Sequence, residues 1–234
     1  MESAQSIVVT HLAQPTEPRF SLNRCGRRRY GTLDELLQTP GVPSTVGHQD
    51  GNIVDPTIRL SKHYRSVIDF PELPPISFLD PLIPTNKIYN GLGWPPKYDV
   101  IEYLPGGFFK EHRDAQMNKS HYATLLIFPP GYPHTGGKLT IKREDDTEFV
   151  FESSTNTQWT FIAFHTHLRH SCDEVLTGRR IVFKSELCYT RTPEQDINNY
   201  IPNIDIIVDR RYYHNPIEEY DIKHNTEIRI NRPL

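Results

Sequence analysis

Short runs rich in Ile, Val, Thr, Phe and Tyr follow one another closely from about residue 88 onward, and this pattern constrains the fold more than any other feature. The runs are 97–104, 122–128, 138–142, 147–152, 159–164, 167–172 and 180–189. Turn signals lie between them at Gly106-Gly107, Gly136-Gly137 and Asp145-Asp146. Many short strands at close spacing are typical of a sandwich, a jelly roll or a barrel. The sequence therefore predicts a mainly β fold in which Trp159 and Phe161 pack the core.

The region before residue 88 predicts helices. Thr32 to Glu35 fits a capping box ahead of two leucines, which predicts a short helix over about 32–38. Asp55-Pro56 is typical of a helix start, with apolar residues following at helical spacing until Pro71. We therefore expect a second helix over about 55–70.

The rest of this region is expected to contain little regular structure. Ile7–Val9 predicts a short strand, whereas residues 40–54 and 71–87 are rich in turn formers or prolines and predict loops. We expect three parts: an N-terminal extension packed on the core (1–87), the β core (88–190) and a C-terminal extension (191–234) with a candidate strand at 205–208.

Composition and charge exclude some classes of protein. The 234 residues carry a formal net charge of −3, which gives no reason to expect binding to nucleic acid or to a membrane surface. The three cysteines form no Cys-x-x-Cys pair, and neither a signal peptide nor an apolar run of about 18 residues is evident. We expect a soluble intracellular protein, cytoplasmic or nuclear. The basic cluster that includes Arg27–Arg29 has two readings, a phosphate contact or a solvated loop, and its flanks favour the loop.

One segment carries a metal-binding pattern. His112 and Asp114 are two residues apart in a segment that reads as a strand leaving the Gly106-Gly107 turn, so their side chains share one face. His170 supplies a second imidazole downstream. Two imidazoles and one carboxylate leave positions open on a metal, which suits non-haem Fe(II) and oxygen chemistry. His165 and His167 compete with His170, because a His-x-His pair also has metal-ligand spacing.

These segments together resemble a family. Tyr103-x-x-Gly-Gly-x-x-x-x-His-x-Asp114, followed by His170, Val175, Gly178 and Arg180, is similar to the Fe(II)/2-oxoglutarate dioxygenases, in particular the prolyl-4-hydroxylase-like branch. The resemblance covers roughly residues 88–190. It implies a double-stranded β-helix, a jelly-roll variant. The resemblance favours His170 over His165 and His167. Only from His170 do Val175, Gly178 and Arg180 follow at the family's spacing of five, eight and ten residues.

The resemblance also implies roles for the site residues. Fe(II) is held by His112, Asp114 and His170, and Arg180 binds the distal carboxylate of 2-oxoglutarate through its planar fork. Tyr103 and Thr124 lie where the family places hydroxyls that hydrogen-bond the cosubstrate. Arg179 is the rival of Arg180, and only one of two successive strand residues can face inward. Many prolyl hydroxylases have lysine at this position, so the arginine weakens any claim to prolyl specificity.

The activity implied is hydroxylation of an unactivated C–H bond, with dioxygen consumed and 2-oxoglutarate decarboxylated to succinate. Ascorbate is a candidate reductant. Asp114 argues against a halogenase, because halogenating relatives replace this carboxylate with a small residue. A protein or peptide side chain is the leading substrate, ahead of a small molecule or a nucleic-acid base, and the loop Phe128–Gly137 is a candidate lid. The alternatives are a non-catalytic jelly-roll binding module and a cupin-like metalloenzyme that uses His165, His167 and His170 without 2-oxoglutarate.

Overall fold

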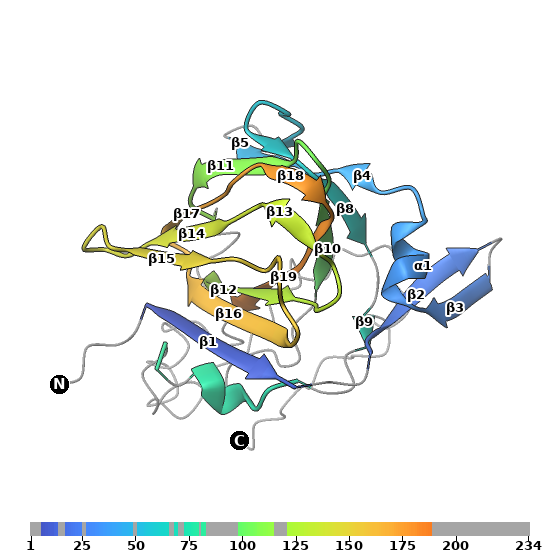
Figure 1. Ribbon diagram of the computed structural model, residues 1–234, viewed down its shortest axis with the longest axis horizontal. Helices are drawn as coiled ribbons and strands as arrows, with labels where there is room; N and C mark the ends of the chain where they lie inside the picture. The colour runs from blue at the N-terminus through green and yellow to red at the C-terminus, as the bar shows by residue number, and fades with distance from the viewer. Residues whose placement is uncertain are drawn as a thin grey trace, which may run out of the picture. The chain divides into compact units, whose positions relative to one another are not determined.

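The chain is mainly β, as predicted, and most of its strands lie in two antiparallel sheets (Figure 1). The structure is a computed structural model. It describes residues 6–13, 17–24, 27–48, 51–65, 68–69, 73–79, 81–82, 98–114 and 121–188. The predicted strand at 205–208 and the whole 191–234 extension lie outside these residues. The division of the chain into three parts therefore stays a prediction.

The larger sheet has seven strands in the order β1-β16-β12-β19-β10-β8-β4. Their bounds are β1 Ile7–Leu12, β4 Val42–Pro43, β8 Lys62–Arg65, β10 Asp99–Tyr103, β12 His121–Phe128, β16 Trp159–His165 and β19 Arg180–Cys188. Strands β1, β4 and β8 come from the N-terminal region. That region therefore extends the sheet at both edges.

The smaller sheet has five strands in the order β15-β14-β17-β11-β7. Their bounds are β7 Arg59–Leu60, β11 Phe108–His112, β14 Leu139–Lys142, β15 Glu148–Phe151 and β17 Arg169–Cys172. With β10, β12, β16 and β19, these strands confirm all seven runs predicted after residue 88, and β11 confirms the strand that leaves the Gly106-Gly107 turn.

Three smaller groups of strands complete the described residues. They are the pair β13 His134–Gly136 and β18 Val175–Gly178, the pair β5 Val46–His48 and β6 Gly51–Ile53, and the triplet β3 Arg27–Gly31, β2 Arg19–Arg24 and β9 Ile68–Asp69. The loops predicted over 40–54 and 128–137 therefore contain short strands. The basic cluster belongs to the β2–β3 hairpin rather than to a loop. These pairings are long-range or only two to five residues long, so local composition does not reveal them.

The larger sheet is buried on both faces, because alternate residues of its central strands pack in two different cores. Leu126, Ile162 and Val182 point toward the smaller sheet and pack with Leu139 and Ile141. Their neighbours in the chain pack on the opposite face, where they meet the N-terminal segment; they include Leu125, Phe161, Phe183 and Trp159. Burial on both faces explains why these strands read as continuous apolar runs. It also bears out the placing of Trp159 and Phe161 in the core.

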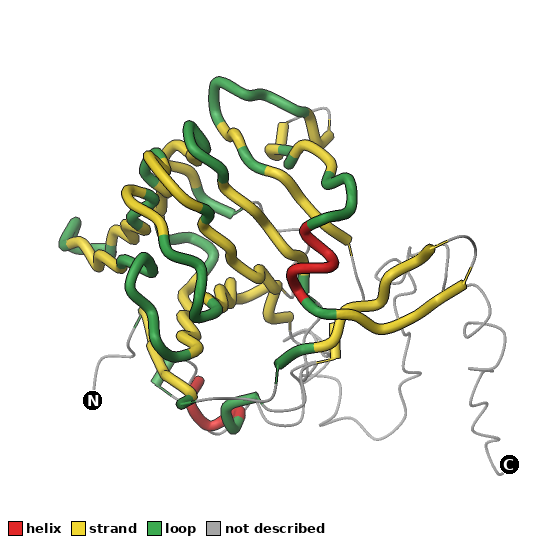
Figure 2. The backbone as a smooth tube through the Cα atoms, turned by 45° about the vertical axis from the view of Figure 1, so that its right-hand side comes forward, coloured by secondary structure: helices red, strands yellow, loops and turns green. Residues whose placement is uncertain are grey.

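The first predicted helix forms as expected. Helix α1 spans Leu33–Leu37, and Thr32 and Glu35 make the reciprocal hydrogen bonds of a capping box, at 3.2 Å and 3.0 Å. Its buried leucines pack beside Phe20 and Leu22 of β2. Figure 2 shows this helix on the chain between the β2–β3 hairpin and the larger sheet. A short 3-10 helix, η1, spans Ile76–Leu79 in the proline-rich stretch.

The second predicted helix, over 55–70, is wrong. The Asp55 carboxylate does accept a hydrogen bond from the Thr57 backbone N–H at 2.9 Å, but only one turn follows before β7 and β8 begin. Pairing of β8 with β10, together with the buried hydrogen bond from the Tyr64 hydroxyl to Glu102 at 2.6 Å, overrides the helical spacing.

Among the described residues, no helix is both long and apolar enough to cross a membrane. An intracellular location stays a prediction.

Candidate metal centre

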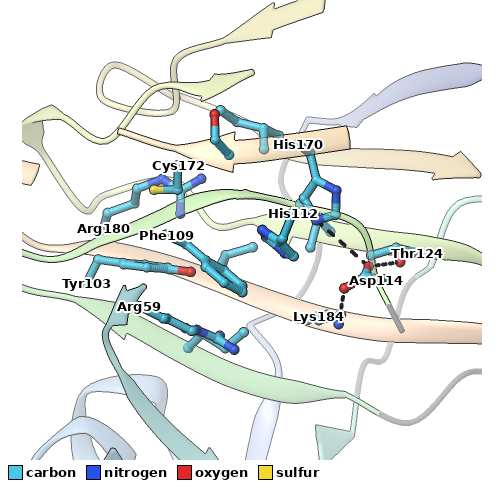
Figure 3. Close-up of a pocket in the computed structure, with 15 residues that line it drawn as sticks. Arg59, Tyr103, Phe109, His112, Asp114, Thr124, His170, Cys172, Arg180 and Lys184 are labelled. Carbon is cyan, nitrogen blue, oxygen red and sulfur yellow. Dashed lines mark hydrogen bonds and ion pairs between the residues drawn. The ribbon is translucent and has the colours of Figure 1, made fainter. Parts of the chain in front are cut away.

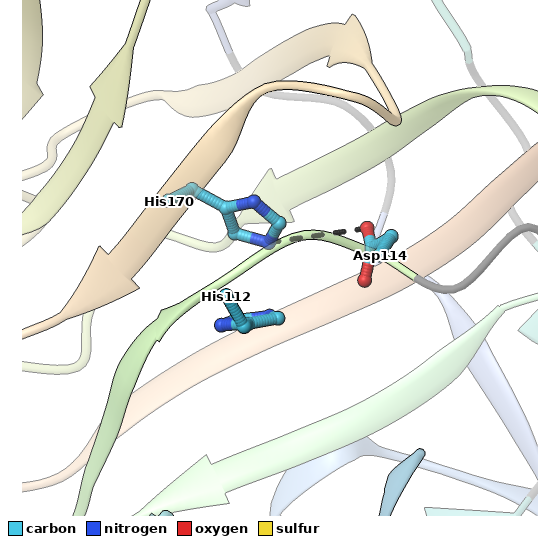
Figure 4. A group of neighbouring side chains, drawn as sticks. All are labelled: His112, Asp114 and His170. Carbon is cyan, nitrogen blue, oxygen red and sulfur yellow. Dashed lines mark ion pairs between the residues drawn. The ribbon is translucent and has the colours of Figure 1, made fainter. Parts of the chain in front are cut away.

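The structure brings His112, Asp114 and His170 together, and their candidate ligand atoms all lie within 4.8 Å of one another (Figure 4). His112 is the last residue of β11, Asp114 follows two residues later, and His170 lies on β17. The two histidines are direct partners across the antiparallel pair of strands. Two segments almost sixty residues apart in sequence thus converge on one point.

A break in the register of β11 aims these side chains. The pairing of β11 with β17 shifts between Phe109 and His112, which marks a bulge or irregularity. In a regular strand, residues three apart face opposite sides. The irregularity instead places both rings in one pocket, where Phe109 stacks on the His112 imidazole with ring centroids 3.5 Å apart. His112 and Asp114 keep the shared face that their spacing predicts.

Backbone carbonyls fix the tautomer of both imidazoles. Nδ1 of His112 lies 2.8 Å from the Lys110 carbonyl oxygen, and Nδ1 of His170 lies 3.1 Å from that of Leu168. A carbonyl only accepts hydrogen bonds, so each Nδ1 carries the proton and each Nε2 keeps its lone pair. Among the described residues, the buried Nε2 atom of His112 has no hydrogen-bond partner. This is the arrangement found around metal-binding histidines, whose second nitrogen is held by an acceptor.

The surroundings keep both imidazoles neutral. Burial, followed by the charge of His170, lowers the pKa of His112 to about 3. Burial also lowers the pKa of His170, although the Asp114 charge opposes the shift. Neutral imidazoles can bind a metal without first losing a proton. The donor set of two neutral nitrogens and one carboxylate fits Fe(II).

Asp114 is buried and held by two other side chains. The Lys184 ammonium lies 2.8 Å from its Oδ1 atom, and the Thr124 hydroxyl donates a short hydrogen bond to Oδ2. Burial alone would raise the pKa of Asp114, but the Lys184 charge and the other partners outweigh burial and hold the pKa far below its usual range. Asp114 is therefore a carboxylate across the neutral range. Thr124, expected beside the cosubstrate, here has the Asp114 carboxylate as its partner.

Arg180 lies at the other end of the same pocket (Figure 3). Arg180 is only 2% exposed, and its guanidinium carbon lies 5.1 Å from the centres of both the Tyr103 and Phe128 rings. Its Nε atom is buried and has no hydrogen-bond partner in the part of the chain that the structure describes. Arg179 instead pairs with the buried Glu102 at 2.9 Å. A buried guanidinium with an unmet donor is costly to leave alone, so this end of the pocket is suited to an anion.

The residues of the motif hold the pocket together. The backbone N–H of Gly106 donates to the Val175 carbonyl, and the Val175 N–H donates to the Gly107 carbonyl, both at 2.8 Å. These bonds join the turn between β10 and β11 to the start of β18. Tyr103 and Arg180, which come from paired positions of β10 and β19, lie directly beyond this junction. The spacing noticed in the sequence thus reflects a backbone junction between the β10–β11 turn and β18.

The rival histidines do not join this centre. His165 and His167 stack on each other with centroids 5.3 Å apart, and Nε2 of His167 lies 2.9 Å from the Glu144 carboxylate. Within the described part of the chain, the only group of three or more metal-ligand residues is that of His112, Asp114 and His170. The geometry therefore gives no support to the cupin-like ligand set.

Sequence reasoning missed several residues that line the pocket, among them Arg59, Phe109 and Lys184. Lys184 was open to inference, because it lies four residues after Arg180 on one strand and so faces the same side. Arg59 was hidden by the wrong helix over 55–70. Phe109 could not be placed, because only the shift in register turns its ring toward His112.

Comparison with known proteins gives likenesses of fold only. No family model matches the chain, and no curated protein matches it. An oxidoreductase of the 2OG-Fe(II) oxygenase family from Burkholderia pseudomallei is similar at 16% identity and a TM-score of 0.42, over 67% of this chain and 76% of that one. A prolyl-4-hydroxylase from Pseudomonas putida is similar at 14% identity and a TM-score of 0.41, over 62% and 77% of the two chains.

A Trichoplax adhaerens prolyl hydroxylase, solved with a peptide fragment of hypoxia inducible factor, is similar at 17% identity and a TM-score of 0.33, over 43% and 44% of the two chains. The solved structures that this chain is similar to are oxygenases and prolyl hydroxylases. At these scores the likenesses assign no activity to the chain. The functional argument therefore rests on the geometry of the site.

Proposed function

We propose that the protein is an Fe(II)- and 2-oxoglutarate-dependent dioxygenase built on a double-stranded β-helix, which hydroxylates an unactivated C–H bond. One observation carries the proposal. Three residues whose candidate ligand atoms lie within 4.8 Å of one another share a pocket with buried Arg180, whose Nε atom has no hydrogen-bond partner among the described residues. A metal centre and an anion site in one pocket suit a cosubstrate that is both a metal chelator and a dicarboxylate.

Each side chain has a task in this proposal. His112, Asp114 and His170 would hold Fe(II), which when bound supplies the activation of dioxygen coupled to decarboxylation of 2-oxoglutarate. Arg180 would bind the distal carboxylate, and Tyr103, packed against its guanidinium, would fix the direction of that fork. Lys184 and Thr124 would hold the Asp114 carboxylate in place.

The apolar walls have a task as well. Leu126, Leu139 and Val182 line the same pocket and would limit the access of water to it. In a drier pocket, the attraction between Arg180 and a carboxylate is stronger than it is in water.

The proposed substrate is a protein or peptide side chain, on the strength of the motif's resemblance to the prolyl-4-hydroxylase-like branch. Dioxygen and 2-oxoglutarate would be consumed, with ascorbate as a candidate reductant. Many prolyl hydroxylases have lysine where this chain has Arg180. The type of residue that is hydroxylated is therefore to be found by screening peptides.

The metal ligands are tested first, by substitution. His112→Ala is expected to lower the affinity for Fe(II) or Co(II) about 100-fold or more, because a whole ligand is lost. His167→Ala is the control, since this exposed histidine pairs with Glu144 and lies outside the centre. Metal titration followed by absorbance measures both. Undiminished binding by His112→Ala would favour a different ligand set.

The anion site is tested with the cosubstrate. Anaerobic addition of Fe(II) and 2-oxoglutarate is expected to give a weak visible charge-transfer band, and aerobic incubation is expected to release succinate. Arg180→Ala should raise the 2-oxoglutarate concentration needed by about 10- to 100-fold, the loss typical of a charge-assisted hydrogen bond, while the metal still binds. Arg143→Ala, which replaces an arginine that does not line the pocket, should behave as wild type. If Arg180→Ala and Arg143→Ala needed the same concentration of 2-oxoglutarate, the role given to Arg180 would be contradicted.

A further inference from the structure

The pocket carries more positive charge than the proposed contents need. Among the described residues that line it, Arg59, Arg180 and Lys184 carry cationic side chains and Asp114 carries the only carboxylate. With Fe(II) and doubly charged 2-oxoglutarate bound, the charges of the metal and the cosubstrate cancel, and Asp114 offsets the charge of Lys184, its ion-pair partner. The pocket as a whole then keeps a surplus of two positive charges, and among the described residues that line it Arg59 has no carboxylate partner. Surplus charge in a partly buried pocket is unfavourable, so a further anion is expected there.

Lys184 is separated from the proposed 2-oxoglutarate anchor. In Figure 3, Arg180 and Tyr103 lie at one end of the pocket, the two imidazoles lie in the middle, and Lys184 lies with Asp114 at the other end. Its side chain keeps 26% of its surface exposed, and among the described residues Asp114 is its only hydrogen-bonding partner. An ammonium has three donors. Lys184 can therefore hold Asp114 and still offer donors to a group that enters from solvent.

Arg59 is held rigidly beside the same pocket. Its Nε donates to the Ser61 hydroxyl at 3.0 Å, and its Nη1 donates to the Thr45 carbonyl at 3.1 Å. Its guanidinium carbon lies 4.5 Å from the centre of the Phe109 ring, which stacks on His112. Within the described part of the chain, Nη2 makes no hydrogen bond. A fixed guanidinium with a free amino group is well prepared to bind a carboxylate, because little freedom remains to be lost.

We propose that the substrate is an acidic peptide, in which Asp or Glu side chains near the hydroxylated residue are bound by Arg59 and by Lys184. The inference rests on the proposed function, because the metal and the cosubstrate set the charge that is left over. The two cations would then act as specificity residues. They would favour carboxylate-bearing segments and reject lysine-rich ones, which would add to the surplus of positive charge.

Equilibrium binding tests this without needing turnover. The probes are fluorescent nonapeptide pools of equal length and apolar content that carry Asp and Glu, Asn and Gln, Lys, or phosphoserine at two positions. The full-length protein is loaded with Co(II) and 2-oxoglutarate, and anisotropy gives the affinities. We expect the acidic pool to bind at least about 10-fold more tightly than the amide pool, the effect of one charge-assisted contact.

The variants separate charge from structure. Lys184→Met and Arg59→Gln should each reduce the preference for acidic over amide peptides to about 2-fold or less, whereas Lys184→Arg, which retains the charge, should keep most of it. Lys138→Met and Arg143→Gln are matched controls, because neither residue lines the pocket, and they should keep the wild-type preference.

Several results would overturn the inference. They are equal binding of acidic and amide pools, tighter binding of the lysine or phosphoserine pool, failure of all pools to bind, or a preference that survives in both Lys184→Met and Arg59→Gln. Failure of the proposed function would look different, because 2-oxoglutarate would then give no charge-transfer band with Fe(II). A normal band with no acidic preference sinks this inference alone.

Discussion

Single residues decide the electrostatics of the centre, since a buried carboxylate, two neutral imidazoles and three cations meet in one pocket. Lys184 and Thr124 hold Asp114, while the carbonyls of Lys110 and Leu168 hold the two rings. The ligands could be read from sequence because their spacing is fixed. The two carbonyls belong to the backbone two residues before each imidazole, so residue type does not reveal them. The contacts of Lys184 and Thr124 with Asp114 depend on how the chain folds, because these residues are far from Asp114 in sequence.

Because the folded protein keeps its imidazoles neutral, its free energy of unfolding is expected to depend on pH. In metal-free protein the pKa of His112 is lowered by burial to about 3, from an ordinary value of 6.5. Below pH 6.5 the unfolded chain takes up a proton that the folded chain refuses, so the free energy of unfolding falls as the pH drops from 6.5 toward 3. The contribution is at most about 1.4 kcal/mol per pH unit for this one group.

Urea denaturation in the presence of a chelator, at several values between pH 7 and pH 4, measures that slope. His112→Gln removes the titrating group and should flatten the slope by up to about 1.4 kcal/mol per pH unit. Identical slopes for wild type and variant would show that His112 is not held neutral by the folded protein.

At the scale of elements, the close approach of β13 and β18 to Arg180 depends on Gly137. Its φ is +69°, and a Cβ added there would lie 2.8 Å from Cδ of Arg180 and 2.9 Å from Cγ2 of Val175. Gly137→Ala is therefore expected to strain the backbone by about 1 kcal/mol and also to displace the guanidinium, which raises the 2-oxoglutarate requirement.

Gly131→Ala is the matched control for this element. Gly131 has a similar positive φ of +86°, but a Cβ there would meet nothing within 4 Å. Gly131→Ala should therefore lower the free energy of unfolding, measured by denaturation, through the same backbone strain. It should leave the 2-oxoglutarate requirement unchanged. If both variants bind the cosubstrate equally, the contact between Gly137 and Arg180 is not what positions the guanidinium.

The elements also show where sequence reasoning holds and where it fails. Strands such as β12 and β19 are buried on both faces, so their composition alone marks them. The wrong helix over 55–70 had a true capping residue in Asp55 and a plausible spacing. Its second half instead forms β8, which pairs with β10, more than thirty residues away, and with β4. Short pairs such as β13–β18 carry too few residues for any periodicity to show.

At the scale of the whole molecule, the centre joins distant parts of one fold. The histidine ligands come from β11 and β17 of the smaller sheet and Asp114 follows β11, while Lys184 and Thr124, which hold Asp114, come from the larger sheet. A metal bound there would join β11 to β17 and would be connected to the larger sheet through Asp114. Any ligand that binds only the folded state stabilises that state.

Metal addition is therefore expected to stabilise the protein as a whole. At a free Co(II) concentration about 100 times the dissociation constant, the free energy of unfolding should rise by about 2.7 kcal/mol, and a chelator should reverse the rise. His170→Ala should show little of this gain, while His167→Ala should show all of it. Thermal or urea denaturation measures the effect, and an equal gain in both variants would place the metal elsewhere.

The irregularity in β11 affects how the site could be lost during evolution. Between Phe109 and His112 the strand is out of step with its neighbour, and both rings face the pocket only because of that offset. Insertion or loss of one amino acid here would restore a regular alternation and turn the imidazole away, while the hydrophobic interior stayed filled. Descendants of this chain could lose their chemistry through a single codon and keep their architecture.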